Sequence, residues 1–154
     1  MATQHVKFDR TQLGVKRPLD RFPMEIRRES VLKYAEIIGE TRPLYVDDGA
    51  ARAAGYRGLV APPAFVAALT IGMDRPDISL EGVGSSVLAT EAVYPIAPIC
   101  AGDTLDAAVH LKSVYPKTGR SGTMVFVVWA IDFTNQEGEP VETIEKSYVY
   151  KGGK

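Results

Sequence analysis

The sequence has very little of the chemistry that most often marks a metal or redox site. Its 154 residues include one cysteine, Cys100, and two histidines, His5 and His110. A single cysteine excludes an internal disulfide and is compatible with a reducing compartment. Because no cluster of cysteine and histidine exists, we expect no bound metal. Cys100 is expected to fill space rather than to act as a nucleophile.

A dominant charge and a long apolar run are also lacking. The chain carries 18 Lys and Arg against 19 Asp and Glu, a net charge of -1. No overall field therefore draws it to nucleic acid or to an anionic membrane. The longest mostly apolar run, Leu59 to Met73, contains Pro62 and Pro63 and is too short to cross a bilayer. Met1 to Leu13 has no signal-peptide core, so we expect a cytoplasmic protein.

What is present is the composition of an ordinary globular domain. Hydrophobic residues make up 45% of the chain and charged residues 24%. A chain of this length can bury a sizeable core, but two domains would be cramped. We expect one domain over residues 1–154, with its core at about 20–150.

Helical spacing occurs in the first half of the chain. One face repeats at Val31, Tyr34, Ala35 and Ile38, and Gly39 suits the residue that ends a helix, so a helix is predicted over Ser30 to Ile38. The following loop, Gly39 to Asp47, is predicted not to be helical. A second short helix is expected from Asp47 or Asp48 to Gly55.

A third helix is expected to be buried. Pro62 and Pro63 are predicted at its first positions, where the amide hydrogens need no partner. The segment Ala64 to Met73 is apolar on nearly every side, so other elements must wrap it.

The second half of the chain has the pattern of strands. They are expected at Val87 to Tyr94, Thr104 to Tyr115, Thr123 to Phe133 and Val141 to Tyr150. The second strand alternates apolar and polar residues from Leu105, which predicts one wet face, while Met124 to Ile131 is apolar on both faces, as in a central strand. Helices followed by antiparallel strands around one buried helix predict an α+β fold with a curled sheet.

Several segments occur in an order typical of one family. They are Tyr34 to Asp47, Ala50-Ala51, Gly55 to Phe65, Pro95 to Asp103 and Asn135 to Tyr150. Together they resemble the MaoC-like dehydratases of the N-terminal, FAS1-like type, over Phe22 to Tyr150. The resemblance implies a single hot-dog fold, a curled antiparallel sheet around a buried helix, that pairs with a second hot-dog chain. It also implies an acyl-CoA or acyl-carrier-protein thioester as substrate, held in a tunnel between units, and no other cofactor.

Active members of that family hydrate an enoyl thioester, or dehydrate a 3-hydroxyacyl thioester, with R stereochemistry. Their Gly-Asp-x-Asn-Pro-x-His motif supplies an acid and a base on either side of a water. Here the motif becomes Gly39 to Tyr45, so Glu40 replaces the Asp, Arg42 the Asn and Tyr45 the His. A phenol titrates near pH 10 and offers no neutral base, and Arg42 favours a salt bridge with Glu40 over proton transfer.

The altered motif is similar to that of the substrate-binding member of heteromeric dehydratases. The leading hypothesis is therefore an acyl-thioester-binding subunit of an R-specific enoyl-CoA hydratase or 3-hydroxyacyl-thioester dehydratase, paired with a hot-dog chain that carries the Asp and His. One alternative is a self-sufficient homodimeric hydratase with Glu40 as base and Tyr45 or water as donor. Another is a non-catalytic acyl-CoA-binding module. A thioesterase ranks last, because Ala64 to Met73 has no carboxylate. Equally, Glu40, Arg42 and Tyr45 can form a plain loop closed by an ion pair and an aromatic plug.

The resemblance also implies that an amide at the start of the buried helix polarises the thioester carbonyl. The prolines have no amide hydrogen, so the candidate donors are Val60, Ala61, Ala64 and Phe65. Substrate binding is assigned to Arg42, Tyr56, Gly58, Ala61, Pro63, Ala64 and Phe65. Met73 is a further candidate for the tunnel, although aromatic and Met residues near a buried helix are more often core. Phosphate binding by Arg52, Arg57, Lys117 or Arg120 competes with ordinary surface charge.

Overall fold

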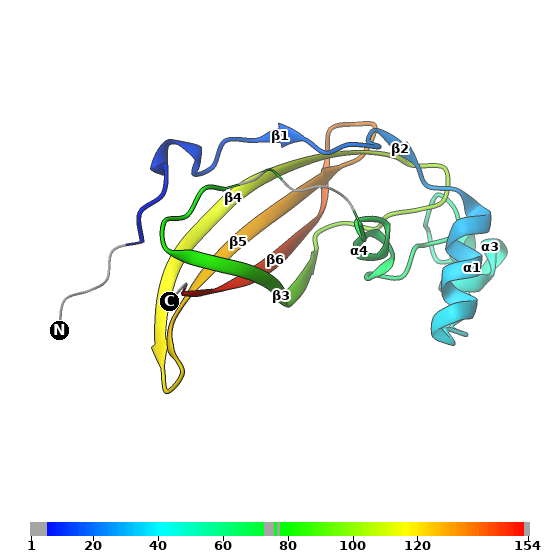
Figure 1. Cartoon of the computed structure of the whole chain (residues 1–154). Helices are drawn as coiled ribbons and strands as arrows, with labels where there is room; N and C mark the ends of the chain where they lie inside the picture. Colours follow the sequence, from blue (N-terminus) through cyan, green and yellow to red (C-terminus); the bar gives the residue numbers. More distant parts are fainter. Residues whose placement is uncertain (1–5, 73–75, 77, 153–154) are drawn as a thin grey trace.

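The computed structural model describes residues 6–72, 76 and 78–152. A six-stranded sheet curls across the molecule, and the α-helices lie toward one end of it (Figure 1). The strands are β1 (Arg17–Pro18), β2 (Met24–Glu25), β3 (Val83–Pro95), β4 (Thr104–Gly119), β5 (Gly122–Thr134) and β6 (Pro140–Gly152). The helices are the short 3-10 turn η1 (Arg10–Gln12), α1 (Arg28–Ile38), α2 (Pro43–Val46), α3 (Asp48–Ala53) and α4 (Phe65–Leu69).

The sheet has the strand order β1-β4-β5-β6-β3, and β2 pairs with β4. All its pairings are antiparallel. The four long strands confirm the sequence prediction, and each is longer than predicted. A curled antiparallel sheet around a short buried helix is the hot-dog fold, which confirms the predicted α+β class.

Alternation along β4 positions the core. Leu105, Ala107, Val109 and Leu111 are buried, whereas Asp106 between them and Lys112 after them are exposed. This confirms the predicted wet face, because successive strand residues point to opposite sides. In β5 the whole run Val127 to Ile131 is buried, as expected of a central strand.

The buried helix α4 differs from the prediction in both its start and its length. Pro62 and Pro63 were expected at its first positions, but they form a turn before it, in which the amide of Phe65 donates to the carbonyl of Pro62 at 2.8 Å. The physical reason is that a proline disfavours helical geometry in the residue preceding it, so Pro63 keeps Pro62 out of a helix. The helix ends at Leu69 rather than Met73, because Thr70 bonds back to Ala67 through both its amide and its hydroxyl.

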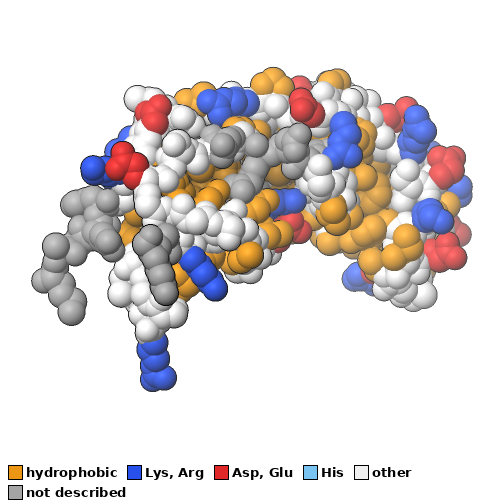
Figure 2. Space-filling view, in the orientation of Figure 1, with side chains coloured by type: hydrophobic (Ala, Val, Ile, Leu, Met, Phe, Trp, Pro, Cys, Tyr) orange, Lys and Arg blue, Asp and Glu red, His pale blue; other side chains and the backbone are white. Residues whose placement is uncertain are grey.

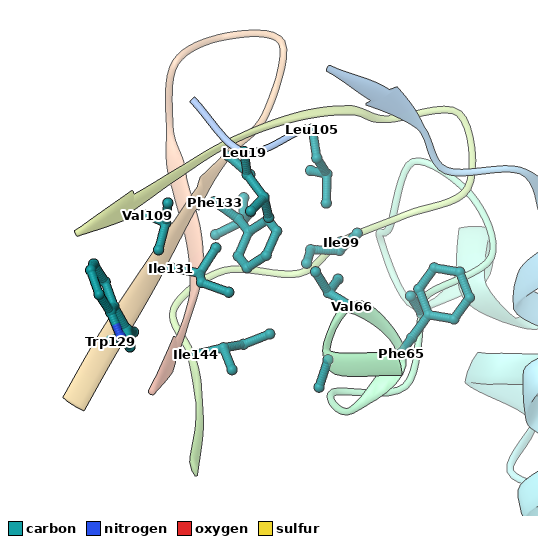
Figure 3. Close-up of a cluster of buried hydrophobic side chains, with 14 of the residues drawn as sticks. Leu19, Phe65, Val66, Ile99, Leu105, Val109, Trp129, Ile131, Phe133 and Ile144 are labelled. Atoms are coloured by element: carbon teal, nitrogen blue, oxygen red, sulfur yellow. The ribbon is translucent and has the colours of Figure 1, made fainter. Parts of the chain in front are cut away.

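Short as it is, α4 supplies a central part of the core. Figure 3 shows Val66 from α4 beside Ile99 and facing side chains of the sheet, whereas the ring of Phe65 lies on the side of the helices. Phe65 and Val66 are almost fully buried. Burying such side chains stabilises the fold by about 1.5–3 kcal/mol each.

The other helices are partly as predicted. Gly39 has a φ of 70° and ends α1, and Asp47 caps α3 by accepting a hydrogen bond from the amide of Ala50. The loop between them was predicted not to be helical, which is wrong, because α2 occupies Pro43–Val46. Pro43 is the first residue of α2, where a missing amide hydrogen costs nothing.

Candidate functional site

A hollow of about 270 Å³ lies where α2, the turn before α4 and the end of β3 meet. Most of its lining is apolar, and Tyr45, Tyr56 and Glu142 bring the polar groups. The apolar lining residues are Leu44, Val60, Ala61, Pro62, Pro63, Pro95, Ile96, Ala97, Pro98 and Ile99. Figure 2 shows hydrophobic side chains gathered between the sheet and α1. A concave, mostly apolar pocket with a few polar groups is typical of a small-molecule site.

The hollow brings together the candidate catalytic residue Tyr45 and some of the predicted substrate-binding residues. Tyr45, Tyr56, Ala61 and Pro63 all line it. Their backbone is held by the sheet and by α2, because the amide of Ala61 donates to the carbonyl of Ile99 at 2.8 Å and that of Val60 to Leu44 at 3.2 Å. The turn before α4 is thereby tied to both walls of the hollow.

Other predicted binding residues lie elsewhere. Phe65 is buried in the core, with its ring edge-on to Tyr34 at 5.5 Å between centroids. Gly58 lies in a separate hollow with Arg52, and a Cβ at this position would be 3.4 Å from the carbonyl oxygen of Ala101. Gly58 thus allows two backbone segments to approach closely. Met73 lies outside the described residues.

Only one of the four candidate amides is uncommitted. The amides of Val60, Ala61 and Phe65 donate to backbone carbonyls. In the described part of the chain, the structure gives no acceptor for the amide of Ala64, the residue that precedes α4. Ala64 is therefore the remaining donor near the hollow.

The altered motif forms a closed ion pair. The Glu40 carboxylate accepts hydrogen bonds from the amides of Thr41 and Arg42 and from the Arg42 guanidinium, with 2.5 Å between Arg42 Nη2 and Glu40 Oε2. These bonds hold the pKa of Glu40 at about 2, and the side-chain bond to Arg42 contributes most. The guanidinium also lies 4.8 Å from the centre of the Tyr45 ring. Glu40 and Arg42 do not line the hollow.

The candidate phosphate-binding residues are dispersed. Arg57 bonds both carboxylate oxygens of the buried Asp103, at 2.7 and 2.9 Å, so it is a structural residue rather than free surface charge. Lys117 lies over the rings of Tyr115 and Phe126 near the β4–β5 turn, where Arg120 also lies. That turn lies at the opposite end of the molecule from α3, which carries Arg52 (Figure 1), so the four residues form no single basic cluster.

Glu142 was missed by the sequence analysis. It lies on β6 and lines the hollow, with 2% of its surface exposed. Its Oε1 is buried and has no hydrogen-bond partner among the described residues, and burial raises its pKa to about 7. The sequence did contain a signal, because Glu142 and the apolar Ile144 are two residues apart and therefore share the inner face of the strand.

A second hollow of about 330 Å³ lies at the other end of α4. The side chains of Lys146 and Glu91 line it, and their charged groups lie 3.2 Å apart. Lys146 Nζ also donates to the carbonyl of Thr70 at 3.4 Å. The indole Nε1 of Trp129, in the same lining, is buried without a partner.

The remaining candidate groups have structural surroundings. Cys100 is buried, and burial raises the pKa of its thiol, which suits the expected space-filling role. His110 lies beside Asp132 on the polar face of β4, while His5 is outside the described residues. Within the described ranges, no group of three or more potential ligands could hold a metal ion.

None of the helices described is long and apolar enough to span a membrane.

Comparison with known proteins places these features in context. The model of the FAS1-like dehydratase domain region matches residues 12–144. A UPF0336 protein of Saccharopolyspora erythraea is 32% identical over 133 residues, covering 83% of this chain and 82% of that protein. The 3-oxo-4,17-pregnadiene-20-carboxyl-CoA hydratase alpha subunit of Mycobacterium tuberculosis is 46% identical over 46 residues, which is 30% of this chain and 15% of that subunit.

Solved structures give the same picture. A MaoC-like dehydratase superposes with a TM-score of 0.72 and 26% identity, over 92% of this chain and 42% of that longer chain. The ChsH1-ChsH2 complex of Mycobacterium tuberculosis contains a chain that superposes with a TM-score of 0.70 and 26% identity, over 89% of this chain and 88% of that one.

Proposed function

The chain belongs to the family of FAS1-like dehydratase domain regions, and on that premise we propose that it is the acyl-thioester-binding subunit of an R-specific enoyl-CoA hydratase or 3-hydroxyacyl-thioester dehydratase. Its partner would be a second hot-dog chain that carries the Asp and His of the family motif. The observation that carries the proposal is the closed Glu40–Arg42 ion pair beside an apolar hollow.

The hollow is suited to an acyl group. Its walls are mostly aliphatic and proline side chains, which favour an apolar ligand because binding removes its surface from water. Tyr45 and Tyr56 supply hydroxyls that can orient a polar group, and the amide of Ala64 lies at the start of α4. Such a site can bind an acyl chain and orient its thioester.

The motif residues are poorly suited to proton transfer. A carboxylate with a pKa of about 2 is a weak base at neutral pH. Its oxygens are already engaged by Arg42 and by two backbone amides. The motif loop therefore does not supply the acid and the base of the hydration step, and a second chain is the source that we propose.

The sheet offers a place for that chain. β3 lies at the edge of the sheet, and its Val87 and Tyr94 side chains are 64% and 50% exposed. An edge strand is a template for pairing with another chain. Among the similar proteins, one is named as an alpha subunit of a hydratase and another belongs to a two-component complex, which supports a heteromeric assembly.

The test is hydration of crotonyl-CoA, followed optically with the chain purified alone. We expect no turnover, while crotonyl-CoA raises the melting temperature. An Asp- and His-containing hydratase serves as the positive control. Adding a hot-dog chain from the same organism that carries the intact motif should produce turnover, and that turnover should survive Glu40→Gln.

The matched control is Glu36→Gln, on the exposed surface of α1. Turnover by the chain alone that disappears in Glu40→Gln and persists in Glu36→Gln would show a self-sufficient hydratase instead. Thermal stabilisation by crotonyl-CoA without turnover in any pairing would leave a non-catalytic acyl-CoA-binding module.

A further inference from the structure

Glu142 occupies an unusual position on the inner face of the sheet. In the register of β6 it lies opposite Pro95 of β3 on one side and Phe133 of β5 on the other. Residues directly opposite in antiparallel strands point to the same face. The carboxyl group is thus flanked by two apolar side chains, and it borders the hollow that contains Tyr45 and Tyr56.

Among the described residues that line the hollow, none carries a positive charge that would neutralise a carboxylate. From β3 and its following loop, the lining residues Pro95 to Ile99 are uncharged, as are Ala61 to Pro63 before α4. The titratable groups that face the site are the tyrosines: Tyr45 of α2, Tyr56, and Tyr34 of α1, whose pKa is raised by burial and by the charge of Glu142. No lysine, arginine or histidine is among the described residues that line the hollow.

A neutral carboxylic acid fits these surroundings better than a carboxylate does. Burial alone raises the pKa of Glu142 to about 7, so the protonated form is well populated at neutral pH. That form has one O–H donor as well as acceptor oxygens. Because buried polar groups are normally hydrogen-bonded, an unpartnered carboxyl at a hollow calls for a ligand group that completes it.

We propose that Glu142 is a substrate-binding residue, which as a neutral carboxylic acid donates a hydrogen bond to an oxygen atom of the bound acyl thioester. The inference rests on the proposed function, because it assumes that the hollow binds an acyl thioester. It adds a polar contact that the family motif does not contain. Substrate binding then depends on the protonation of the Glu142 carboxyl group.

The test is calorimetric binding of crotonyl-CoA, which carries a thioester carbonyl, at about pH 6 and about pH 8. If only the protein with protonated Glu142 binds, the wild-type affinity should fall about tenfold from pH 6 to pH 8, in proportion to the fraction of protein in that form. Glu142→Gln keeps a donor of the same shape that does not titrate, so its affinity should lack this decrease. Glu142→Leu has no donor and should bind weakly at both pH values.

A second measurement uses the same titrations in two buffers of different ionisation heat. Wild-type protein should take up a proton on binding at about pH 8, because the ligand stabilises the protonated carboxyl. Glu142→Gln should lack that uptake. The matched control is Glu145→Gln, on the same strand but paired with Lys112 on the other face; it should bind as the wild type does.

The outcomes separate the two proposals. Binding that is equally strong at both pH values, and unchanged in Glu142→Gln and Glu142→Leu, would overturn the role of Glu142 and leave the acyl-binding function standing. Failure of the wild type to bind crotonyl-CoA at either pH would overturn both.

Discussion

Two glutamates of this chain have opposite surroundings and therefore opposite chemistry. Glu40, in the motif loop, accepts hydrogen bonds from Arg42 and from two amides, and its pKa falls to about 2. Glu142, on the inner face of β6, is buried without a partner for Oε1, and its pKa rises to about 7. The residue at the position of the family's acid-base group is thus held in its charged form, while the proton-binding group near neutral pH lies on a strand.

A third carboxylate, Asp103, shares the burial of Glu142 but has several hydrogen-bond donors. Asp103 is 3% exposed, nearly as buried as Glu142. It accepts hydrogen bonds from Arg57, from the amide of Cys100 and from Gln136. Asp103 and Glu142 are thus alike in burial and differ in the hydrogen-bond donors that reach their oxygens.

The largest expected effect is on the pH dependence of stability at Glu142. Its pKa is raised from about 4.5 unfolded to about 7 folded, so its contribution is full below pH 4.5 and is lost as pH rises through 7. In Glu142→Gln this loss is absent. Relative to the wild type, the free energy of unfolding of the variant should therefore increase by about 3 kcal/mol as the pH rises from acidic to mildly alkaline. Urea unfolding across that range measures it, and a constant difference would contradict the buried, neutral carboxyl.

A smaller effect is expected from removing the partner of Asp103. Arg57→Ala should lower the free energy of unfolding by about 2 kcal/mol, because it leaves a buried carboxylate with fewer donors. The value is below that of a fully buried pair, since half of the Arg57 side chain is exposed. Arg52→Ala, nearby and exposed, is the control and should change stability by less than about 0.5 kcal/mol. Equal effects in both variants would show that Arg57 is ordinary surface charge.

The smallest effect is expected at Glu40. Its pKa is lowered to about 2, so its contribution is present above the unfolded value and is lost as pH falls through 2. Because the pair lies at the surface, Glu40→Gln should change the melting temperature only slightly, and salt should remove the difference. The Glu142 effect should persist in salt. A large decrease in the melting temperature of Glu40→Gln that persists in salt would mean that Glu40 contributes to stability as a buried group does, like Glu142.

The sequence could predict a good part of the candidate site. Tyr45, Tyr56, Ala61 and Pro63 line the hollow because the motif loop and the turn before α4 are close in sequence to the elements that place them. The Glu40–Arg42 ion pair also followed from their spacing. Glu142 was missed because Pro95 of β3, which lies opposite it, and the turn before α4, which shares the hollow with it, come from distant parts of the chain.

The fold shows the same division. The four long strands were predictable from alternation and turn residues, since those signals are local. The short helix α2 was not, because its four residues have too little periodicity to distinguish them from a loop. The end of α4 depended on Thr70 bonding back to Ala67, which apolar content alone does not predict.

The sequence by itself determined the four long strands, the end of α1 at Gly39 and the altered motif, because each depends on residues that are neighbours along the chain. Only the tertiary structure decided which carboxyl group holds a proton near neutral pH. That property depends on how many donors and how much water surround each oxygen. For Glu142, the donors and the water around the carboxyl group depend on α1, the turn before α4 and β6. These segments are far apart in the sequence and meet only when the sheet curls around α4.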